Sequence, residues 1–146
     1  MPAIAPKVVV IAICAGALAY CDPHSEVVDL FASMTAALAD DNVPGFMNGF
    51  DRNMEQYDTL RACIDALVAE AEVTSAIESV KDQGDEAKRS VDLDWTLQIR
   101  SRQAAGPLVQ RQQIVHAELV RQKKHWRIVS IRPLDFFAPA KFSESK

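Results

Sequence analysis

Strict alternation runs through Val91-Asp92-Leu93-Asp94-Trp95-Thr96-Leu97-Gln98-Ile99-Arg100, with an apolar residue at every odd position and a polar residue at every even one. A period of two is typical of a β-strand with one buried face and one solvated face. A slip of one residue would reverse the faces and expose Trp95 and Leu97, at about 1.5–3 kcal/mol for each large side chain. We therefore expect Trp95 in the core and the acids Asp92 and Asp94 in water.

Further strands surround this one. The same period predicts strands over about 73–81, 87–102, 108–121 and 125–135, separated by short turns that include Gln83-Gly84-Asp85 and Ala104-Ala105-Gly106-Pro107. Short turns between long strands predict an antiparallel meander. With a turn at 104–107, Trp95 is expected beside Ala117 and Asp94 beside Glu118. Arg127 on the last strand would then complete a cross-strand charge triplet with these two acids.

Helical patterns precede the strands. Asp22-Pro23 favours a helix start with a carboxylate cap, and an apolar stripe at spacings of three and four continues to Leu38. Pro44 is expected to start a short second helix, and a third apolar stripe predicts a helix over about 57–71. Three helices followed by one antiparallel sheet indicate an α+β fold in which the helices cover the apolar face of the sheet.

Size and charge limit the classes of function. A chain of 146 residues with 49% apolar content fits one globular domain, which we place at 21–146. The formal net charge of −4 disfavours nucleic acid as a partner. Cations cluster late in the chain, at Arg100, Arg102, Arg111, Arg121, Lys123, Lys124, Arg127 and Arg132. We interpret them as a solvated surface, and an anion site is the alternative.

The first residues resemble an export signal. Lys7 is followed by an uncharged apolar run over 8–19, which is short for a bilayer span and ends in small residues. Residues 1–20 are therefore predicted to be a signal peptide of an exported, periplasmic or outwardly anchored protein. Leu18-Ala19-Tyr20-Cys21 also resembles a lipoprotein signal, although Tyr20 replaces the usual small residue. A lipid on Cys21 would be the one link to a membrane. A buried N-terminal helix or strand is the alternative, which Pro2 and Pro6 disfavour.

Motifs for metal or cofactor chemistry are absent from the sequence. The cysteines Cys14, Cys21 and Cys63 form no CxxC pair, and the three histidines lie far apart. There is no glycine-rich phosphate loop, no HExxH and no GxSxG. We expect no metal and no cofactor.

The order of elements resembles the nuclear transport factor 2-like (SnoaL-like) superfamily over about 25–137. The resemblance rests on the first helix, the short helix led by Pro44, the helix at 57–71, the long strands and the closing segment Trp126-Arg127-Ile128-Val129-Ser130-Ile131. It implies a cystatin-like cone, with three helices packed on a curved four-stranded meander around a pocket. Members of that superfamily include isomerases, dehydratases, hydrolases and proteins that only bind, so the fold alone determines no function.

The leading hypothesis is a non-enzymatic exported domain that binds a small apolar ligand or a protein partner. The expected pocket lining is apolar and comprises Phe31, Met34, Phe50, Leu93, Trp95, Leu97, Val115 and Ala117. On the outer face, an apolar patch is expected at Ile114, Val120, Val129 and Ile131. Such patches often mark subunit contacts, so the sequence predicts a homodimer through this face.

The alternative hypothesis is a small-molecule isomerase, dehydratase or hydrolase. Its base would be Asp51 or Asp58, and Tyr57 would donate to a developing oxyanion. Each residue also has a structural interpretation: Asp51 as a loop salt bridge with Arg52, Asp58 as a cap or first-turn acid, and Tyr57 as a core residue. His116 is the residue to watch for any site on the outer face.

Overall fold

A computed structural model describes residues 22–103 and 106–142. The elements in chain order are α2 (Pro23–Ala39), α3 (Val43–Met47), α4 (Tyr57–Glu70), β1 (Ala71–Gly84), β2 (Lys88–Ser101), β3 (Leu108–Gln122), β4 (His125–Arg132) and the short 3-10 helix η2 (Leu134–Phe137). The predicted signal peptide at 1–20 and Cys21 lie outside the described residues. Among the helices that are described, none has the length and apolar character to cross a membrane.

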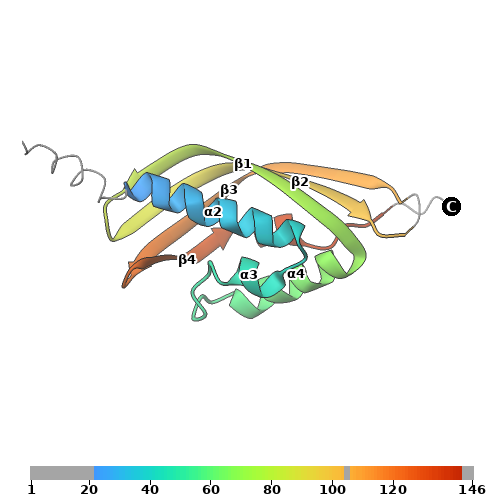
Figure 1. Cartoon of the computed structure of the whole chain (residues 1–146), viewed down its shortest axis with the longest axis horizontal. Helices are drawn as coiled ribbons and strands as arrows, with labels where there is room; N and C mark the ends of the chain where they lie inside the picture. The colour runs from blue at the N-terminus through green and yellow to red at the C-terminus, as the bar shows by residue number, and fades with distance from the viewer. Residues whose placement is uncertain (1–21, 104–105, 143–146) are drawn as a thin grey trace, which may run out of the picture.

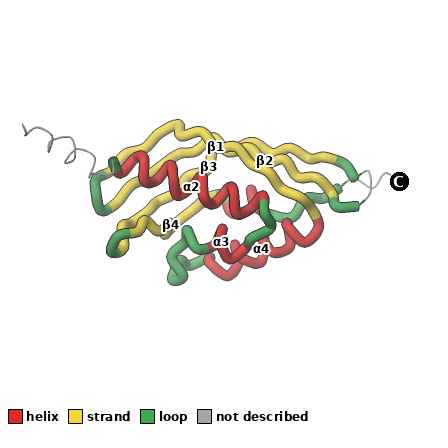
Figure 2. The backbone as a smooth tube through the Cα atoms, in the orientation of Figure 1, coloured by secondary structure: helices red, strands yellow, loops and turns green. Residues whose placement is uncertain are grey.

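The predicted α+β architecture is confirmed. The four strands form one antiparallel sheet in the order β1-β2-β3-β4. Figure 1 shows the sheet curving over the helices, with α2 along its concave side and α3 and α4 below α2. The tube in Figure 2 shows the same two layers, with all the helices on one side of the sheet. This arrangement places the core between α2 and the inner face of the sheet.

The core contains the odd residues of β2, as the alternation predicts. Val91, Leu93, Trp95, Leu97 and Ile99 are all buried. From α2, the Phe31 ring meets Trp95 edge to face, with 6.1 Å between ring centroids. Burial of these side chains is the dominant favourable term that holds α2 on the sheet.

The predicted pairing of β2 with β3 is wrong in register. Trp95 lies opposite Gln113 and Asp94 lies opposite Ile114. The hairpin closes earlier than expected, because the backbone N–H of Ser101 donates to the Pro107 carbonyl at 3.1 Å. The shift is an even number of residues, so the buried face is unchanged, but the predicted charge triplet does not form. Its third member, Arg127, lies opposite Val120.

A β-bulge in β4 overturns the outward placement of Ile131. Glu118 pairs with Ser130 while Leu119 pairs with Ile128, so Val129 is an extra residue on its strand. An extra residue moves everything after it to the opposite face. Ile128 and Ile131 are therefore both buried.

Both ends of the described chain depart in detail from expectation. Asp22 precedes α2 as predicted, but its carboxylate makes no capping hydrogen bond. The last strand was expected to reach Asp135, but it ends at Arg132, and the following η2 buries Phe136 and Phe137. The Phe137 ring lies 5.1 Å from Trp95, centroid to centroid, so this segment belongs to the core.

Two arginines connect the sheet to its surroundings. Arg111 donates through Nη1 to the carbonyl oxygens of Phe136 at 2.7 Å and Ala138 at 2.6 Å. Burial lowers the pKa of this guanidinium, and nearby Asp135 partly opposes that effect. At the other end of the sheet, Arg121 and the Trp126 indole N–H both donate to Glu26 Oε1 of α2. The Arg121 guanidinium also lies 4.8 Å from the Trp126 ring centroid.

Candidate functional site

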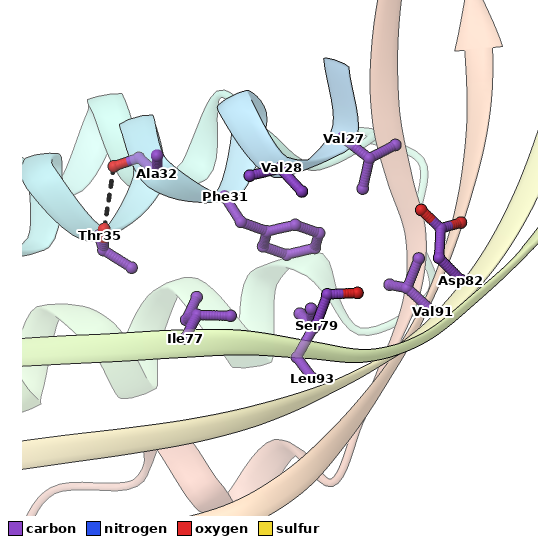
Figure 3. Close-up of a pocket in the computed structure, with 10 residues that line it drawn as sticks. All are labelled: Val27, Val28, Phe31, Ala32, Thr35, Ile77, Ser79, Asp82, Val91 and Leu93. Carbon is purple, nitrogen blue, oxygen red and sulfur yellow. Dashed lines mark hydrogen bonds between the residues drawn. The ribbon is translucent and has the colours of Figure 1, made fainter. Parts of the chain in front are cut away.

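A groove lies between α2 and the inner face of β1 and β2, with a volume of about 170 Å³. We call it the α2 groove. Its lining residues are Val27, Val28, Phe31, Ala32 and Thr35 from α2, Ile77, Ser79 and Asp82 from β1, and Val91 and Leu93 from β2. Figure 3 shows the Phe31 ring at the centre, between the helix and the strands. The wall is therefore mainly aliphatic and aromatic.

The sequence of β1 explains why this space is not filled. Ser75 and Ser79 face inward, opposite Leu97 and Leu93 of β2, where larger apolar side chains would reach α2. A bulge at Val80 follows, and this residue is 60% exposed. Because of the bulge, Asp82 is the next residue to share the inner face with Val91. Small and polar side chains on one wall thus leave an opening beside α2.

Asp82 closes one end of the α2 groove with an ion-paired carboxylate. Its side chain is 7% exposed and accepts from Arg89 Nε at 2.7 Å through one oxygen and from His24 Nδ1 through the other. Of the other polar lining groups, the Thr35 hydroxyl donates to the Ala32 carbonyl at 2.9 Å. Among the described lining residues, Asp82 is thus the one ionisable side chain, and both of its oxygens already have partners.

Two buried polar atoms near the groove have no partner among the described residues. They are the Trp95 indole nitrogen Nε1 and the Ser75 hydroxyl oxygen. Ser75 and Trp95 lie on the inner faces of neighbouring strands, since Ser75 is opposite Leu97 and Ile77 is opposite Trp95. A buried polar group without a hydrogen bond costs about 1–3 kcal/mol. The inner face therefore carries a donor and an acceptor behind its apolar wall.

The residues expected to line a pocket divide into three sets. Phe31 and Leu93 line the α2 groove. Phe50 lines a second hollow, described below, and the other five, Met34, Trp95, Leu97, Val115 and Ala117, are buried in the core. Sequence reasoning did not include Val27, Val28 and Ile77 of the wall. The signal that could have located them is the pair of inward serines on β1, which marks where packing against α2 is incomplete.

A second, polar hollow of about 290 Å³ lies at the β4 edge of the sheet. We call it the β4-edge hollow, and it is lined by Met47, Asn48, Phe50, Asp51, Arg52, Tyr57, Gln122 and Arg127. The loop after α3 is fixed to β4 here. The Ile128 backbone N–H donates to the Gly49 carbonyl at 2.8 Å, and the Asp51 N–H donates to the Ile128 carbonyl at 2.8 Å. Phe50 thereby forms a parallel bridge with Ile128.

Two of the three catalytic candidates predicted from the sequence line this hollow, and the third does not. Asp51 and Tyr57 line it, whereas Asp58 is exposed in the first turn of α4. Asp51 Oδ1 accepts from the Asn53 backbone N–H at 2.8 Å, and Oδ2 accepts from Gln122 Nε2 at 2.9 Å. In the described part of the chain, the expected Asp51–Arg52 salt bridge does not form. The Asp51 carboxylate accepts a hydrogen bond from the Gln122 side chain instead.

His116 lies in a polar cluster on the outer face. Its Nδ1 is 2.7 Å from Asp92 Oδ1, and its Nε2 is 3.4 Å from both Ser90 Oγ and Glu118 Oε2. Serine, histidine and aspartate in this order have the connectivity of a hydrolase triad. Here, however, Glu118 competes for the same nitrogen, and the 3.4 Å between Ser90 Oγ and His116 Nε2 is longer than the usual reach between a nucleophile and its base. We interpret the cluster as a cross-strand charge network.

The apolar patch of the outer face is smaller than expected. Ile114 is 49% exposed, Val120 and Val129 are half-buried, and Ile131 is in the core. Pairing of two copies through this face stays a prediction. Over residues 22–103 and 106–142, no group of three or more histidine, cysteine or acidic side chains is arranged to hold a metal ion.

Comparison with known proteins defines the class of fold. No protein-family model matches the chain, and a search of curated proteins found no match. A conserved protein from Planctomyces limnophilus matches with a TM-score of 0.68 at 6% identity, over 74% of this chain and 91% of that one. An NTF-2-like protein of unknown function from Shewanella oneidensis matches with a TM-score of 0.62 at 10% identity, over 75% and 97%.

A candidate scytalone dehydratase from Novosphingobium aromaticivorans is also similar, with a TM-score of 0.66 at 8% identity, over 74% of this chain and 80% of that one. These likenesses show that the chain has the nuclear transport factor 2-like fold, an α+β cone of helices on a curved sheet. The resemblance deduced from the order of elements is confirmed at the level of the fold. Fold alone does not assign an activity.

Proposed function

We propose that this chain is an exported domain that binds a small, mainly apolar molecule in the α2 groove without transforming it. The observation that carries the proposal is the mainly apolar wall around about 170 Å³. An engineered apolar cavity of about 150 Å³ is large enough to bind benzene or xenon. The α2 groove therefore suits one aromatic ring or a short branched aliphatic group.

Binding is favoured over catalysis because the described lining residues offer no free acid or base that could activate the Ser79 or Thr35 hydroxyl. Catalysis needs a group within hydrogen-bond reach of the reacting atom and able to exchange a proton with it. Asp82 is the one ionisable residue in the described part of the lining, and its carboxylate is paired with Arg89 and His24. Its place at the end of an apolar groove suits a ligand with one polar group directed toward this ion pair.

Indole is a suitable probe for the test, because it combines an aromatic ring with one N–H donor. We expect titration with indole to shift the amide and methyl resonances of the lining residues. Ala32→Phe places a ring in the groove and is expected to abolish binding. Ala36→Phe is the matched control, since Ala36 is exposed on α2 and does not line the groove. Equal loss of binding in both variants, or no binding by the unmodified protein, would refute the proposal.

The enzymatic alternative has one observation in its favour, which is that Asp51 and Tyr57 share the β4-edge hollow. The fold neighbour described as a candidate dehydratase makes this alternative worth testing. A substrate proton would have to compete with the Asn53 and Gln122 donors already on the Asp51 carboxylate. Turnover of a small hydroxy or keto compound that Asp51→Asn abolishes, and that Asp58→Asn leaves unchanged, would establish this activity in place of simple binding.

A further inference from the structure

The β4-edge hollow has more hydrogen-bond donors than acceptors. Arg52, Arg127 and Tyr57 line it, while Asp51, the one carboxylate among its described lining residues, already accepts two hydrogen bonds. Arg127 is half-buried and uses Nη1 to donate to the Trp126 carbonyl at 3.2 Å, and its other N–H groups have no hydrogen-bond partner among the described residues. The hollow therefore carries a net positive charge in a chain whose formal net charge is −4.

The floor of the hollow is apolar. Met47 and Phe50 are buried residues of the lining, and the Tyr57 ring is half-buried beside them. A donor-rich rim over an apolar floor matches a molecule with an anionic head and a hydrocarbon body. Arginine suits such a head, because its planar guanidinium donates two parallel hydrogen bonds to a carboxylate or a phosphate.

We propose that the β4-edge hollow is a binding site for the carboxylate or phosphate group of a small organic anion. Arg127 and Arg52 hold the oxyanion, and the body of the ligand lies against Phe50 and Met47. The loop that carries Arg52 is already fixed to the sheet, through the Gly49 and Asp51 backbone bonds to Ile128 and through the Asp51–Gln122 side-chain bond. Little ordering is then required on binding, which favours affinity.

This site also accounts for part of the late cationic cluster. Arg127 belongs to that cluster, and Lys123 and Lys124 directly follow Gln122 of the lining. Unlike Arg127, Arg100 of the cluster is exposed on β2 and lines none of the hollow. The proposal concerns a different cavity from the α2 groove, with a different probe, so its outcome is independent of the proposed apolar-ligand function.

The test titrates the labelled full domain with benzoate and with inorganic phosphate at low ionic strength, followed by NMR shifts. We expect benzoate to shift residues around the hollow and Arg127→Gln to weaken its binding by about tenfold or more, as for loss of a charge-assisted bidentate contact. Arg127→Lys keeps the charge but loses the two parallel N–H donors of the guanidinium, so we expect a benzoate affinity between those of the wild type and Arg127→Gln. Arg52→Gln changes an exposed loop residue, so it tests the site even if a β4 variant folds poorly.

Arg100→Gln is the matched control, because it removes the same charge from an exposed position of β2. We expect it to leave the benzoate affinity unchanged. Phosphate binding that is also weakened by Arg127→Gln would show that the oxyanion alone is recognised, and stronger binding of benzoate would show that the apolar floor contributes. Absence of any shift at the hollow with either probe at millimolar concentration would overturn the proposal. So would equal weakening by Arg100→Gln and Arg127→Gln.

Discussion

At the scale of single residues, Trp95 is central to the core. It is 0% exposed and meets the rings of Phe31, Phe136 and Phe137, but its indole N–H has no partner among the described groups. We expect Trp95→Phe to destabilise the domain far less than Trp95→Ala, because phenylalanine retains ring packing and removes the unsatisfied donor. Truncation to alanine should cost about 3–5 kcal/mol in urea unfolding. Equal costs for the two variants would show that the N–H makes a bond that stabilises the fold.

The backbone conformation at position 84 requires a glycine. Its φ is +142°, and a Cβ added there would lie 2.2 Å from the Lys88 carbonyl oxygen. We expect Gly84→Ala to lower the free energy of unfolding by about 1–3 kcal/mol. Ala87→Gly in the same turn is the control and should have a much smaller effect. Thermal denaturation of both variants measures the difference, and an unchanged Gly84→Ala protein would contradict this backbone geometry.

At the scale of elements, the stability that the β1–β2 turn contributes depends on pH. The Asp85 carboxylate accepts the backbone N–H groups of Ala87 at 2.8 Å and Lys88 at 2.9 Å, and these bonds lower its pKa below the ordinary value of 3.8. A depressed folded-state pKa means that the contribution to stability is present above about pH 3.8 and is lost as the pH falls through the lower folded value.

We therefore expect the Asp85 carboxyl to titrate below 3.8 in an NMR pH series. The Ala87 and Lys88 amide signals should move with the same midpoint. In Asp85→Asn this low-pH step should disappear, while the amide oxygen still accepts the bonds. Titration of Asp85 at or above its ordinary value would contradict the proposed role of the turn.

The elements also show where sequence reasoning succeeds and where it ends. Alternation predicts the buried face of β2, because successive side chains of a strand point to opposite faces of the sheet. It does not predict the bulges at Val80 and Val129, since one inserted residue leaves no compositional signal. The η2 segment was not predicted because the last strand was extended to Asp135, although the adjacent pair Phe136-Phe137 indicates further core.

At the scale of the whole molecule, the candidate sites differ in how predictable they are. Asp51 and Tyr57 were predicted because charged and aromatic residues gather in one loop and the helix start that follows it. The α2 groove depends on the distance between α2 and β1, which two inward serines and a bulge determine together. Such a space arises from packing in three dimensions, so the sequence pattern alone predicted only Phe31 and Leu93 of its wall.

The outer face provides a prediction about assembly. If two copies pair there, as the sequence analysis expects, Ile114 lies in the contact, because it is 49% exposed on that face. Native mass spectrometry should then show a dimer that Ile114→Lys converts to a monomer. Val80→Lys, at an exposed bulge residue of β1, is the control and should leave the dimer intact. A wild-type monomer at micromolar concentration would refute pairing.

Export can be tested on the intact chain. We expect expression of residues 1–146 without an added tag in a bacterial host to yield a mature protein that starts at Tyr20 or Cys21, as residues 1–20 resemble a signal peptide. Intact mass then distinguishes the two cuts and shows any acyl chains on Cys21. A full-length mass in the cytoplasmic fraction would contradict export.

The central claim is that the hydrocarbon wall between α2 and the inner sheet receives a ligand. Intermolecular nuclear Overhauser effects from bound indole test it most directly. We predict cross-peaks from the indole protons to the Phe31 ring and to the methyl groups of Val28 and Leu93, which line the α2 groove. Cross-peaks confined to Ile114 and its outer-face neighbours, with none to these three residues, would contradict the claim.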